Sequence, residues 1–127
     1  GITIGYITGM QLANMYGFTS QNPSCIEVCS NEATTTQRKL NIAGRTVIVY
    51  KPLAKVTEKN KTALQFLDFM TVIDIYSEIS GDALQYKLKE YVKEINIDFK
   101  IVREYIALYP DKVYRNIYQG GLMHELV

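Results

Sequence analysis

The side chains that most often perform nucleophilic or acid–base catalysis are few and scattered in this sequence. Its single histidine, His124, lies close to the C-terminus, in a segment that we expect to fray beyond Gly120-Gly121. A Ser-His-Asp or Cys-His arrangement would have to use this histidine, and catalytic groups need rigid support. We therefore predict that His124 is exposed and takes no part in catalysis.

Two cysteines could supply thiol chemistry or metal ligands. Cys25 and Cys29 lie four residues apart in a predicted strand, a separation of roughly 13 Å along one strand face. A disulfide requires α-carbons within about 7 Å, so we do not expect the two to pair with each other. Two thiols and one distant histidine do not make a four-ligand metal site. We interpret both thiols as small packing groups, and free thiols suit a reducing compartment.

Paired carboxylates are the other candidates for acid–base work. Asp68 and Asp74 lie in one apolar segment, about 120° apart around a helix, so we predict that they do not share a helix face. We interpret both as polar edges of a mostly apolar helix. The only nuclease-like candidate, Glu27-Val28-Cys29, has a thiol where such a metal centre needs lysine, and no glycine-rich phosphate loop is present. The sequence thus predicts no catalytic residue, no metal site and no cofactor.

Two groups of residues could instead bind a partner. The first is a basic hairpin whose cations could contact phosphates while Tyr50 stacks on a base. Its basic residues are Arg38, Lys39, Arg45 and Lys51. The second is a set of tyrosines four residues apart, a spacing that shares a helix face and suits a protein interface. These tyrosines are Tyr105, Tyr109, Tyr114 and Tyr118. The alternatives are a solvated hairpin whose charges discourage edge pairing, and tyrosines at the rim of an ordinary core.

The composition is typical of one folded domain. The chain has 127 residues, of which 47% are hydrophobic and 21% charged. A net charge of +1 makes no strong field to attract nucleic acid or an anionic membrane. No apolar stretch reaches the roughly 18 residues of a membrane span, and the N-terminus lacks the pattern of a signal peptide. We expect a cytoplasmic protein without a membrane partner.

The N-terminal part is predicted to hold a short helix and a small sheet. A helix over 9–16 would begin at the capping-box sequence Thr8-Gly9-Met10-Gln11 and end at Gly17, where positive φ costs little. Alternation over 24–30 predicts a half-buried strand. Two β-rich runs joined at Ala43-Gly44 predict a hairpin that ends before Pro52.

The C-terminal part is predicted to be helical, because the apolar period changes near residue 60. Residues 62–76 are apolar on most sides, as in a central helix covered by others, and three further helices follow, the last over 112–118. The chain is therefore predicted to be one α+β domain: a short N-terminal helix, a small antiparallel sheet with a hairpin, then a cluster of about four helices. Residues 1–52 would carry the first helix and the sheet, and residues 53–127 the helical part.

One segment of this chain carries a helix-and-turn motif that can be compared with known families. Residues 7–23 contain a short helix that begins at Thr8-Gly9 and runs into the turn Gly17-Phe18-Thr19-Ser20-Gln21-Asn22-Pro23. A strand over 26–30 and a hairpin over 40–50 follow in order. On these residues the chain resembles AbiEi-like antitoxins and related abortive-infection transcriptional regulators of bacteria. The resemblance covers about the first 52 residues with some specificity, and its matching residues are structural.

The resemblance implies a cytoplasmic, non-enzymatic domain that follows an N-terminal winged helix. The whole protein would repress its own operon and oppose a nucleotidyltransferase-like toxin, or contribute to phage defence. No winged helix is apparent in residues 1–127, so DNA would be read by a missing N-terminal domain, and a protein partner or a second copy of the chain would be the other partner. The loop over 31–37 is less basic than that of the family, which weighs against phosphate contact there.

Three hypotheses therefore follow from the sequence. The first is a regulatory interaction domain of an antitoxin-like regulator. The second is a nucleic-acid-binding domain that acts through the basic hairpin. The third is an enzyme with an unrecognised site, supported only by the carboxylate pair Asp68 and Asp74 and by Cys25 or Cys29.

Overall fold

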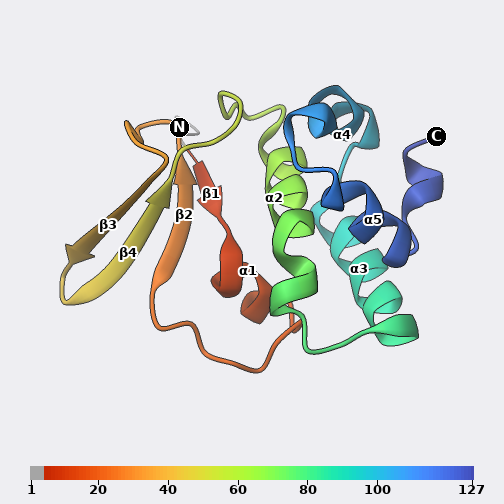
Figure 1. Ribbon diagram of the computed structural model, residues 1–127, viewed down its shortest axis with the longest axis horizontal. Coiled ribbons are helices and arrows are strands. Elements are labelled where there is room, and N and C mark those ends of the chain that lie inside the picture. Colours follow the sequence, from red (N-terminus) through yellow and green to blue (C-terminus); the bar gives the residue numbers. More distant parts are fainter. Residues whose placement is uncertain (1–4) are drawn as a thin grey trace.

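The computed structural model describes residues 5–127 and consists of one sheet followed by a group of helices (Figure 1). The strands are β1 (Gly5–Ile7), β2 (Ile26–Ser30), β3 (Gln37–Ile42) and β4 (Arg45–Tyr50). The α-helices are α1 (Gly9–Met15), α2 (Lys61–Tyr76), α3 (Gly81–Ile95), α4 (Phe99–Tyr105) and α5 (Lys112–Gln119), and two 3-10 turns are η1 (Ile106–Leu108) and η2 (Met123–Glu125). The predicted α+β class is confirmed, with a short first helix and four later α-helices.

The sheet has the strand order β1-β2-β4-β3. The hairpin of β3 and β4 is antiparallel and turns at Ala43-Gly44, as predicted. Both turn residues have positive φ. The prediction of a purely antiparallel sheet is wrong, because β4 lies between β3 and β2 and runs parallel to β2, with Ile26 opposite Val47. Hydrophobic alternation indicates that a strand is half-buried but carries no information about the direction of its neighbour.

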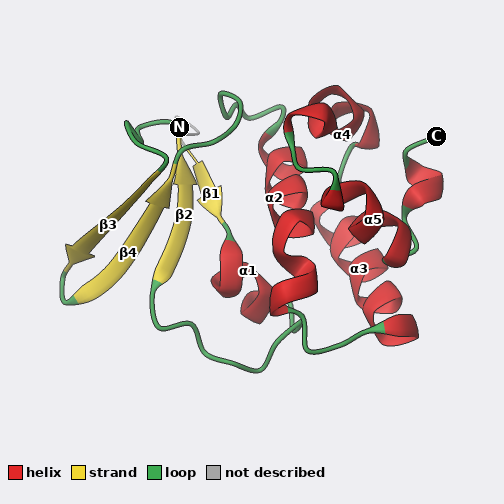
Figure 2. Cartoon of the chain, in the orientation of Figure 1, coloured by secondary structure: helices red, strands yellow, loops and turns green. Residues whose placement is uncertain are grey.

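A short strand that the sequence did not indicate, β1, completes the sheet. It pairs antiparallel with β2 and places Tyr6 opposite Cys29. Paired residues point to the same face of a sheet, so Tyr6, Cys29 and the neighbouring Glu27 share one face, and all three are buried. The helices lie on one side of this sheet, with α1 and α2 nearest to it (Figure 2).

Helix α2 is the centre of the molecule, as its sequence predicted. It begins one residue before the predicted helix, and seven of its side chains are buried. It packs against α1 on one side and against α4 and α5 on the other. Phe69 of α2 makes edge-to-face ring contacts with Phe18 and Tyr91, at centroid distances of 4.9 Å and 5.8 Å. This central position lets one helix present different side chains to the sheet and to the C-terminal helices.

The C-terminal segment is ordered, so the prediction of a frayed tail after Gly120-Gly121 is wrong. Leu122 is 2% exposed, and its backbone N–H donates to the carbonyl of Ile117 at 3.0 Å. Arg103 Nη1 donates to the carbonyl of Glu125 at 3.2 Å. The buried Leu122 and the partly buried Leu126 pack this end against the core. Within residues 5–127, no helix is long and apolar enough to cross a membrane.

Candidate functional site

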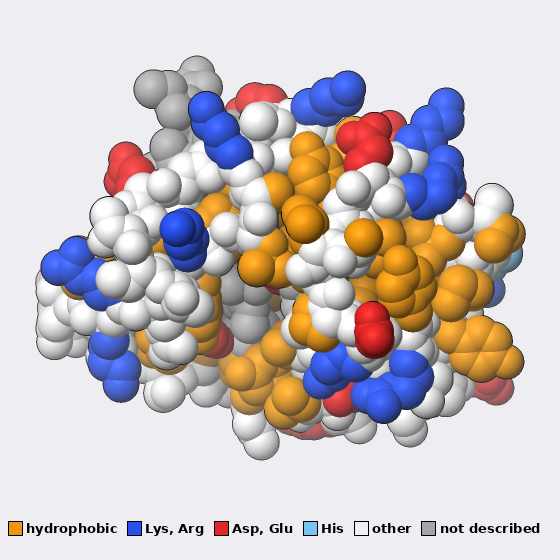
Figure 3. All heavy atoms as spheres, turned by 45° about the horizontal axis from the view of Figure 1, so that its top comes forward, with side chains coloured by type: hydrophobic (Ala, Val, Ile, Leu, Met, Phe, Trp, Pro, Cys, Tyr) orange, Lys and Arg blue, Asp and Glu red, His pale blue; other side chains and the backbone are white. Residues whose placement is uncertain are grey.

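A cavity of about 320 Å³ lies between the sheet and the helices. In Figure 3, hydrophobic side chains lie on both sides of the hollow between the hairpin and the helical part. Small-molecule sites usually have volumes of roughly 300–1,000 Å³, so this cavity suits a small ligand. Its polar lining consists of Thr8, Glu27, Thr36, Tyr50, Lys51, Asp68, Thr71, Tyr76 and Tyr109, and its apolar lining includes Cys29, Leu53, Val72 and Pro110.

Glu27 holds the sheet side of the cavity. It is 6% exposed, and each of its oxygens accepts a hydrogen bond: Oε2 from the backbone N–H of Met10 at 2.9 Å, and Oε1 from the Tyr50 hydroxyl at 2.8 Å. Charge-assisted bonds of this kind are about twice as strong as neutral ones. Gly9 lets the carboxylate come this close, because a Cβ at that residue would lie 2.4 Å from Oε2.

This arrangement corrects the predicted capping box at the start of α1. Thr8 makes no side-chain capping bond, and Gln11 does not reach back to it. Instead Glu27, from a different element, accepts from the first turn, while Gln11 Oε1 accepts from the backbone N–H of Glu27 at 3.2 Å. The sequence pattern describes only local partners, and here a buried strand residue replaces them.

Asp68 of α2 holds the opposite side of the cavity. Its carboxylate accepts a short hydrogen bond from the Tyr6 hydroxyl of β1. Burial raises the pKa of Asp68 to about 6, against the lowering effect of the bond from Tyr6. Burial likewise raises the pKa of the neighbouring Cys29 thiol to about 12. At neutral pH the thiol is therefore protonated, and Asp68 is mostly ionised.

Tyr109 closes the cavity from the segment between η1 and α5. It is 5% exposed, and its hydroxyl makes no hydrogen bond of ordinary geometry with any residue that the structure describes. Burial raises the pKa of this hydroxyl, and the nearby Asp68 carboxylate raises it further. An unpaired buried hydroxyl costs roughly 1–3 kcal/mol relative to a paired one. Such a group at a cavity wall is available to a ligand.

The charge of the cavity is unbalanced. Across residues 5–127, neither Glu27 nor Asp68 forms an ion pair with a lysine or arginine. Lys51 is the one base in the lining, and it is exposed to water. No group of three or more metal-ligating side chains is found in the described part of the chain. The arrangement provides two carboxylates and several aromatic rings, and thus the means to hold a ligand.

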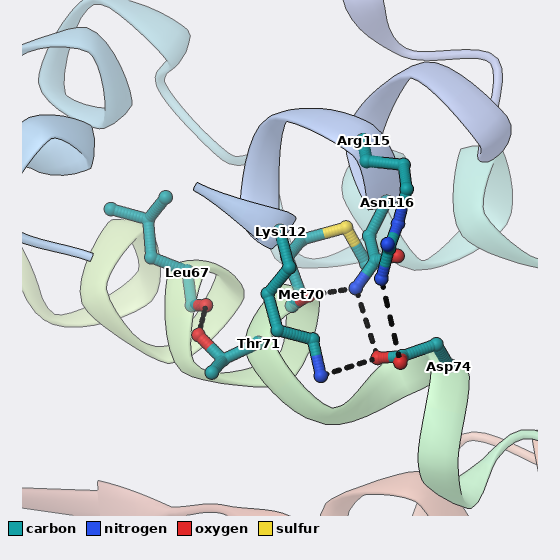
Figure 4. Close-up of polar contacts among 7 residues, drawn as sticks. All are labelled: Leu67, Met70, Thr71, Asp74, Lys112, Arg115 and Asn116. Atoms are coloured by element: carbon teal, nitrogen blue, oxygen red, sulfur yellow. Dashed lines mark hydrogen bonds and ion pairs between the residues drawn. The ribbon is translucent and has the colours of Figure 1, made fainter. Parts of the chain in front are cut away.

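Asp74, the second carboxylate of α2, lies in a separate cluster that joins α2 to α5 (Figure 4). Its Oδ1 accepts from Lys112 Nζ at 3.1 Å and from Asn116 Nδ2 at 3.0 Å, and Arg115 Nη2 lies 3.8 Å from Oδ2. Burial acts to raise the pKa of Asp74, but the bonds from Lys112 and Asn116 outweigh it and lower the pKa. The prediction that the two aspartates do not share a helix face is confirmed. Asp74 is a polar edge as predicted, whereas Asp68 faces the cavity.

The basic hairpin is exposed, and its strand cations are divided between two faces, with Arg38 and Arg45 on one and Lys39 on the other. Arg38, Lys39, Arg45 and Lys51 are all exposed. Arg38 lies opposite Val49 and Lys39 opposite Ile48, so strand alternation sends these two cations to opposite faces of the sheet. Tyr50 is not free to stack on a base, because its ring lines the cavity and its hydroxyl donates to Glu27. Figure 3 shows Lys and Arg scattered over this side of the molecule.

The four tyrosines divide into two pairs with different surroundings. Tyr114 and Tyr118 lie on α5 and are exposed, Tyr118 to 70%. Tyr105 is half-buried and accepts from Asn60 Nδ2 at 3.2 Å, and Tyr109 is buried. The prediction that Tyr105 and Tyr109 share a helix face is wrong, because α4 ends at Tyr105 and the chain continues as the 3-10 turn η1 before Pro110. Of these four tyrosines, Tyr114 and Tyr118 present exposed rings to a protein partner.

The remaining predicted groups lie largely where expected. Cys25 and Cys29 are both free thiols, with Cys29 buried. His124 is exposed, and its Nε2 lies 3.2 Å from Glu125 Oε1. Sequence reasoning missed Tyr6 and the role of Glu27. The available signal was an acid that alternates with two cysteines on one face of a strand, a pattern that places a charge on a buried face.

The candidate site is therefore the cavity together with the side chains that line it. It combines the buried Glu27 carboxylate, the partly buried Asp68 carboxylate, three tyrosine rings and an unpaired hydroxyl around one small cavity. Comparison of the chain with protein-family models, with curated proteins and with solved structures found no match.

Proposed function

We propose that this chain is a non-catalytic binding domain that regulates a larger protein by holding a small molecule in the cavity between β2, β4 and α2. One observation carries the proposal: the cavity lies at the junction of sheet and helices and is lined by Glu27, Asp68 and Tyr109, of which Tyr109 lacks a partner. Pockets of this size with a few convergent polar groups are the usual sites of small ligands.

The chemistry of the lining favours binding over catalysis. Both oxygens of Glu27 already accept hydrogen bonds from the fold, which fixes the carboxylate in place. Cys29 is a poor nucleophile, because a thiol pKa of about 12 leaves almost no thiolate at neutral pH. Asp68 is held by Tyr6. These groups orient and recognise a ligand, and none is arranged as a nucleophile beside its base.

The biological setting that we propose is an antitoxin-like bacterial transcriptional regulator, cytoplasmic and active in abortive infection or phage defence. It rests on the resemblance of residues 7–23. Gly17 has φ +78, which only glycine adopts freely, and the turn that follows is tied to Glu78, which accepts from Thr19 Oγ1 at 2.6 Å and from the Ser20 N–H at 3.1 Å. In this setting a preceding domain would contact DNA, and this domain would respond to the ligand.

A reporter experiment tests the proposal in the intact protein. The promoter of its gene is fused to a reporter in cells that produce the protein, and Val72→Phe, which fills the cavity, is compared with Ile75→Phe on the exposed side of α2. We expect repression by the wild-type protein and an altered reporter response for Val72→Phe only. If the protein neither represses the reporter nor protects cells from a toxin encoded by a neighbouring gene, the proposed role as a regulator is wrong. Equal behaviour of the two variants would overturn the role of the cavity.

Nucleic-acid binding through the hairpin is the second candidate, favoured by four exposed basic residues on or beside β3 and β4. Binding of the chain to DNA and to RNA is measured across a series of salt concentrations. If contacts to phosphates dominate, the logarithm of the association constant should fall linearly with the logarithm of the salt concentration. The slope should be about −0.9 for each duplex phosphate contacted. Affinity that does not change with salt would exclude this candidate.

A further inference from the structure

We propose that the ligand of this cavity is a small organic amine in its cationic form: a primary ammonium group on a short hydrocarbon body. The inference rests on the proposed function and names the ligand class of that site. It combines three independent features of the cavity: carboxylates without a cation, aromatic walls and a buried hydroxyl without a partner.

The first feature is charge. Glu27 and Asp68 face the cavity from opposite walls, one from β2 and one from α2, and no cation neutralises either of them within residues 5–127. A carboxylate removed from water is costly unless it is paired. Lys51 also lines the cavity, but it is exposed to water, which screens its charge, and it forms no ion pair with either carboxylate. The cavity therefore disfavours an anion and favours a cation.

The second feature is the aromatic wall. The rings of Tyr50, Tyr76 and Tyr109 line the same cavity as the two carboxylates. The face of an aromatic ring attracts a cation, and desolvation strengthens this attraction. Leu53, Val72 and Pro110 complete the lining with apolar surface. A ligand with a charged head and a hydrocarbon body would match both parts, whereas an inorganic ion would leave the apolar part unused.

The third feature is the Tyr109 hydroxyl, which is buried at the cavity wall and lacks a hydrogen-bond partner in the described part of the chain. Buried polar groups almost always have a partner in a folded protein, and this hydroxyl, unlike the equally unpaired one of Tyr91, belongs to a residue that lines the cavity, where a ligand can reach it. A primary ammonium has three N–H donors and no acceptor. The Tyr109 oxygen and the two carboxylates, which retain free lone pairs, are the acceptors that such a group would use.

Calorimetric titration of the chain with four probes tests the ligand class. The probes are n-butylammonium, n-butanol, butyrate and tetramethylammonium, which separate charge, shape and N–H donation. We expect n-butylammonium to bind at least about tenfold more tightly than n-butanol and butyrate, a ratio in the range of charged hydrogen bonds. Equal binding of n-butanol would overturn charge recognition. Binding of tetramethylammonium as tight as that of n-butylammonium would overturn N–H donation to Tyr109.

Matched variants locate the binding in this cavity. Asp68→Asn is expected to weaken n-butylammonium binding at least about tenfold, and Tyr109→Phe, which removes one oxygen, about threefold or more. The controls are Asp74→Asn, which lies on α2 like Asp68, and Tyr114→Phe, which lies on the helix α5 that follows Tyr109. Both should leave the affinity for n-butylammonium unchanged. If Asp68→Asn fails to fold, Tyr109→Phe still decides the question. Loss of binding in the controls as well would contradict the assignment.

The outcomes for ligand class and for proposed function are distinguishable. If no probe binds while Val72→Phe still alters the reporter response, the amine is wrong and the regulatory cavity stands. If n-butylammonium binds but Val72→Phe and Ile75→Phe behave alike in the reporter, the amine site stands and its regulatory role fails.

Discussion

Helix α2 carries two aspartates six residues apart, and they lie in opposite electrostatic surroundings. Asp74 faces α5, where Lys112, Arg115 and Asn116 surround it, and its pKa is lowered. Asp68 faces the cavity, where a tyrosine is its hydrogen-bond donor and no described cation forms an ion pair with it, and its pKa is raised to about 6. The same side chain on the same helix therefore stabilises the fold at one position and costs free energy at the other.

The two aspartates differ in whether the polar groups around them find partners within the protein. The cluster around Asp74 pairs its charge and its hydrogen bonds within the protein. The cavity around Asp68 leaves one carboxylate uncompensated and the Tyr109 hydroxyl unpaired. Natural proteins break the rules of polar satisfaction mainly at functional sites. The following variants test this division, in order of decreasing effect.

Gly9→Ala should have the largest effect, because it removes the support of the cavity wall. Gly9 has φ +67, and the new Cβ would lie 2.4 Å from Glu27 Oε2. The carboxylate cannot move away without losing its bonds to Met10 and Tyr50. We expect a loss of about 3–4 kcal/mol in the free energy of unfolding, from backbone strain and lost charged hydrogen bonds.

Gly81→Ala is the matched control for that measurement. Gly81 also has positive φ, +59, but nothing lies within 4 Å of an added Cβ. Only the backbone strain of about 1 kcal/mol should remain. Urea denaturation of both variants measures the difference. Equal losses would show that Glu27 is not held as rigidly as its hydrogen bonds indicate.

Asp68→Asn should change how stability depends on pH. The folded pKa of about 6 lies above the ordinary 3.8, so in the wild type the folded state binds the proton more tightly and loses stability as pH rises from about 4 to 6. The titratable groups that face Asp68 are Tyr6, Cys29 and Tyr109, whose pKa values are all raised, so they stay neutral in this window. The variant minus wild-type difference in unfolding free energy should increase by about 2–3 kcal/mol between pH 4 and pH 7.

Denaturant titrations at pH 4, 5, 6 and 7 provide this measurement. Taking the difference between the two proteins cancels the contributions of all other titrating groups that the substitution leaves unchanged. A difference that stays constant over the whole range would mean that Asp68 titrates normally, and the comparison of the two aspartates would then lose its basis.

Asn116→Ala should destabilise the cluster between α2 and α5 by about 1–3 kcal/mol. Asn116 is buried, and its Nδ2 donates both to the Met70 carbonyl at 2.7 Å and to Asp74 Oδ1 at 3.0 Å. The exposed Gln119→Ala on the same helix controls for the change in helix propensity. Thermal or urea unfolding should show a loss for Asn116→Ala alone. A loss shared by both variants would assign the effect to α5 itself.

Asp74→Asn should have the smallest effect, below about 1 kcal/mol, because its ion pairs are partly exposed to water. The sign is opposite to that of Asp68. The lowered pKa means that Asp74 stabilises the fold above the ordinary 3.8 and that this contribution disappears as pH falls further. The variant should therefore be less stable than the wild type at pH 7 and about equally stable in strong acid. Added salt should reduce the difference in unfolding free energy at pH 7. A gap that grows with acid would refute this.

The elements of the fold that depend on local sequence were predictable. The apolar run of α2 and the turn at Ala43-Gly44 appear at the predicted residues. The Asp98 cap of α4 also forms, with Oδ1 accepting from the Lys100 N–H at 2.9 Å. In each case the partners lie within a few residues of one another, where periodicity and capping rules apply.

The candidate site was not predictable from such patterns. Its main bond joins Tyr6 and Asp68, which are 62 residues apart in the sequence, and it depends on the three-residue strand β1. The position of Glu27 follows from the parallel pairing of β2 with β4, which single-strand alternation does not reveal. Tyr109 enters the cavity because α4 stops at Tyr105, so a uniform helical spacing misplaced it.

The insertion of β4 between β2 and β3 has a kinetic consequence. The hairpin joins residues close in sequence, beginning with Ile42 and Arg45, whereas β4 meets β2 only across the longer separation of Ile26 and Val47. Closing a longer loop costs more chain entropy, and hairpins form within about 1–10 μs. During refolding, the β3–β4 ribbon should thus assemble first and add to β2 as a preformed unit, so the wall of the cavity that carries Tyr50 is completed late.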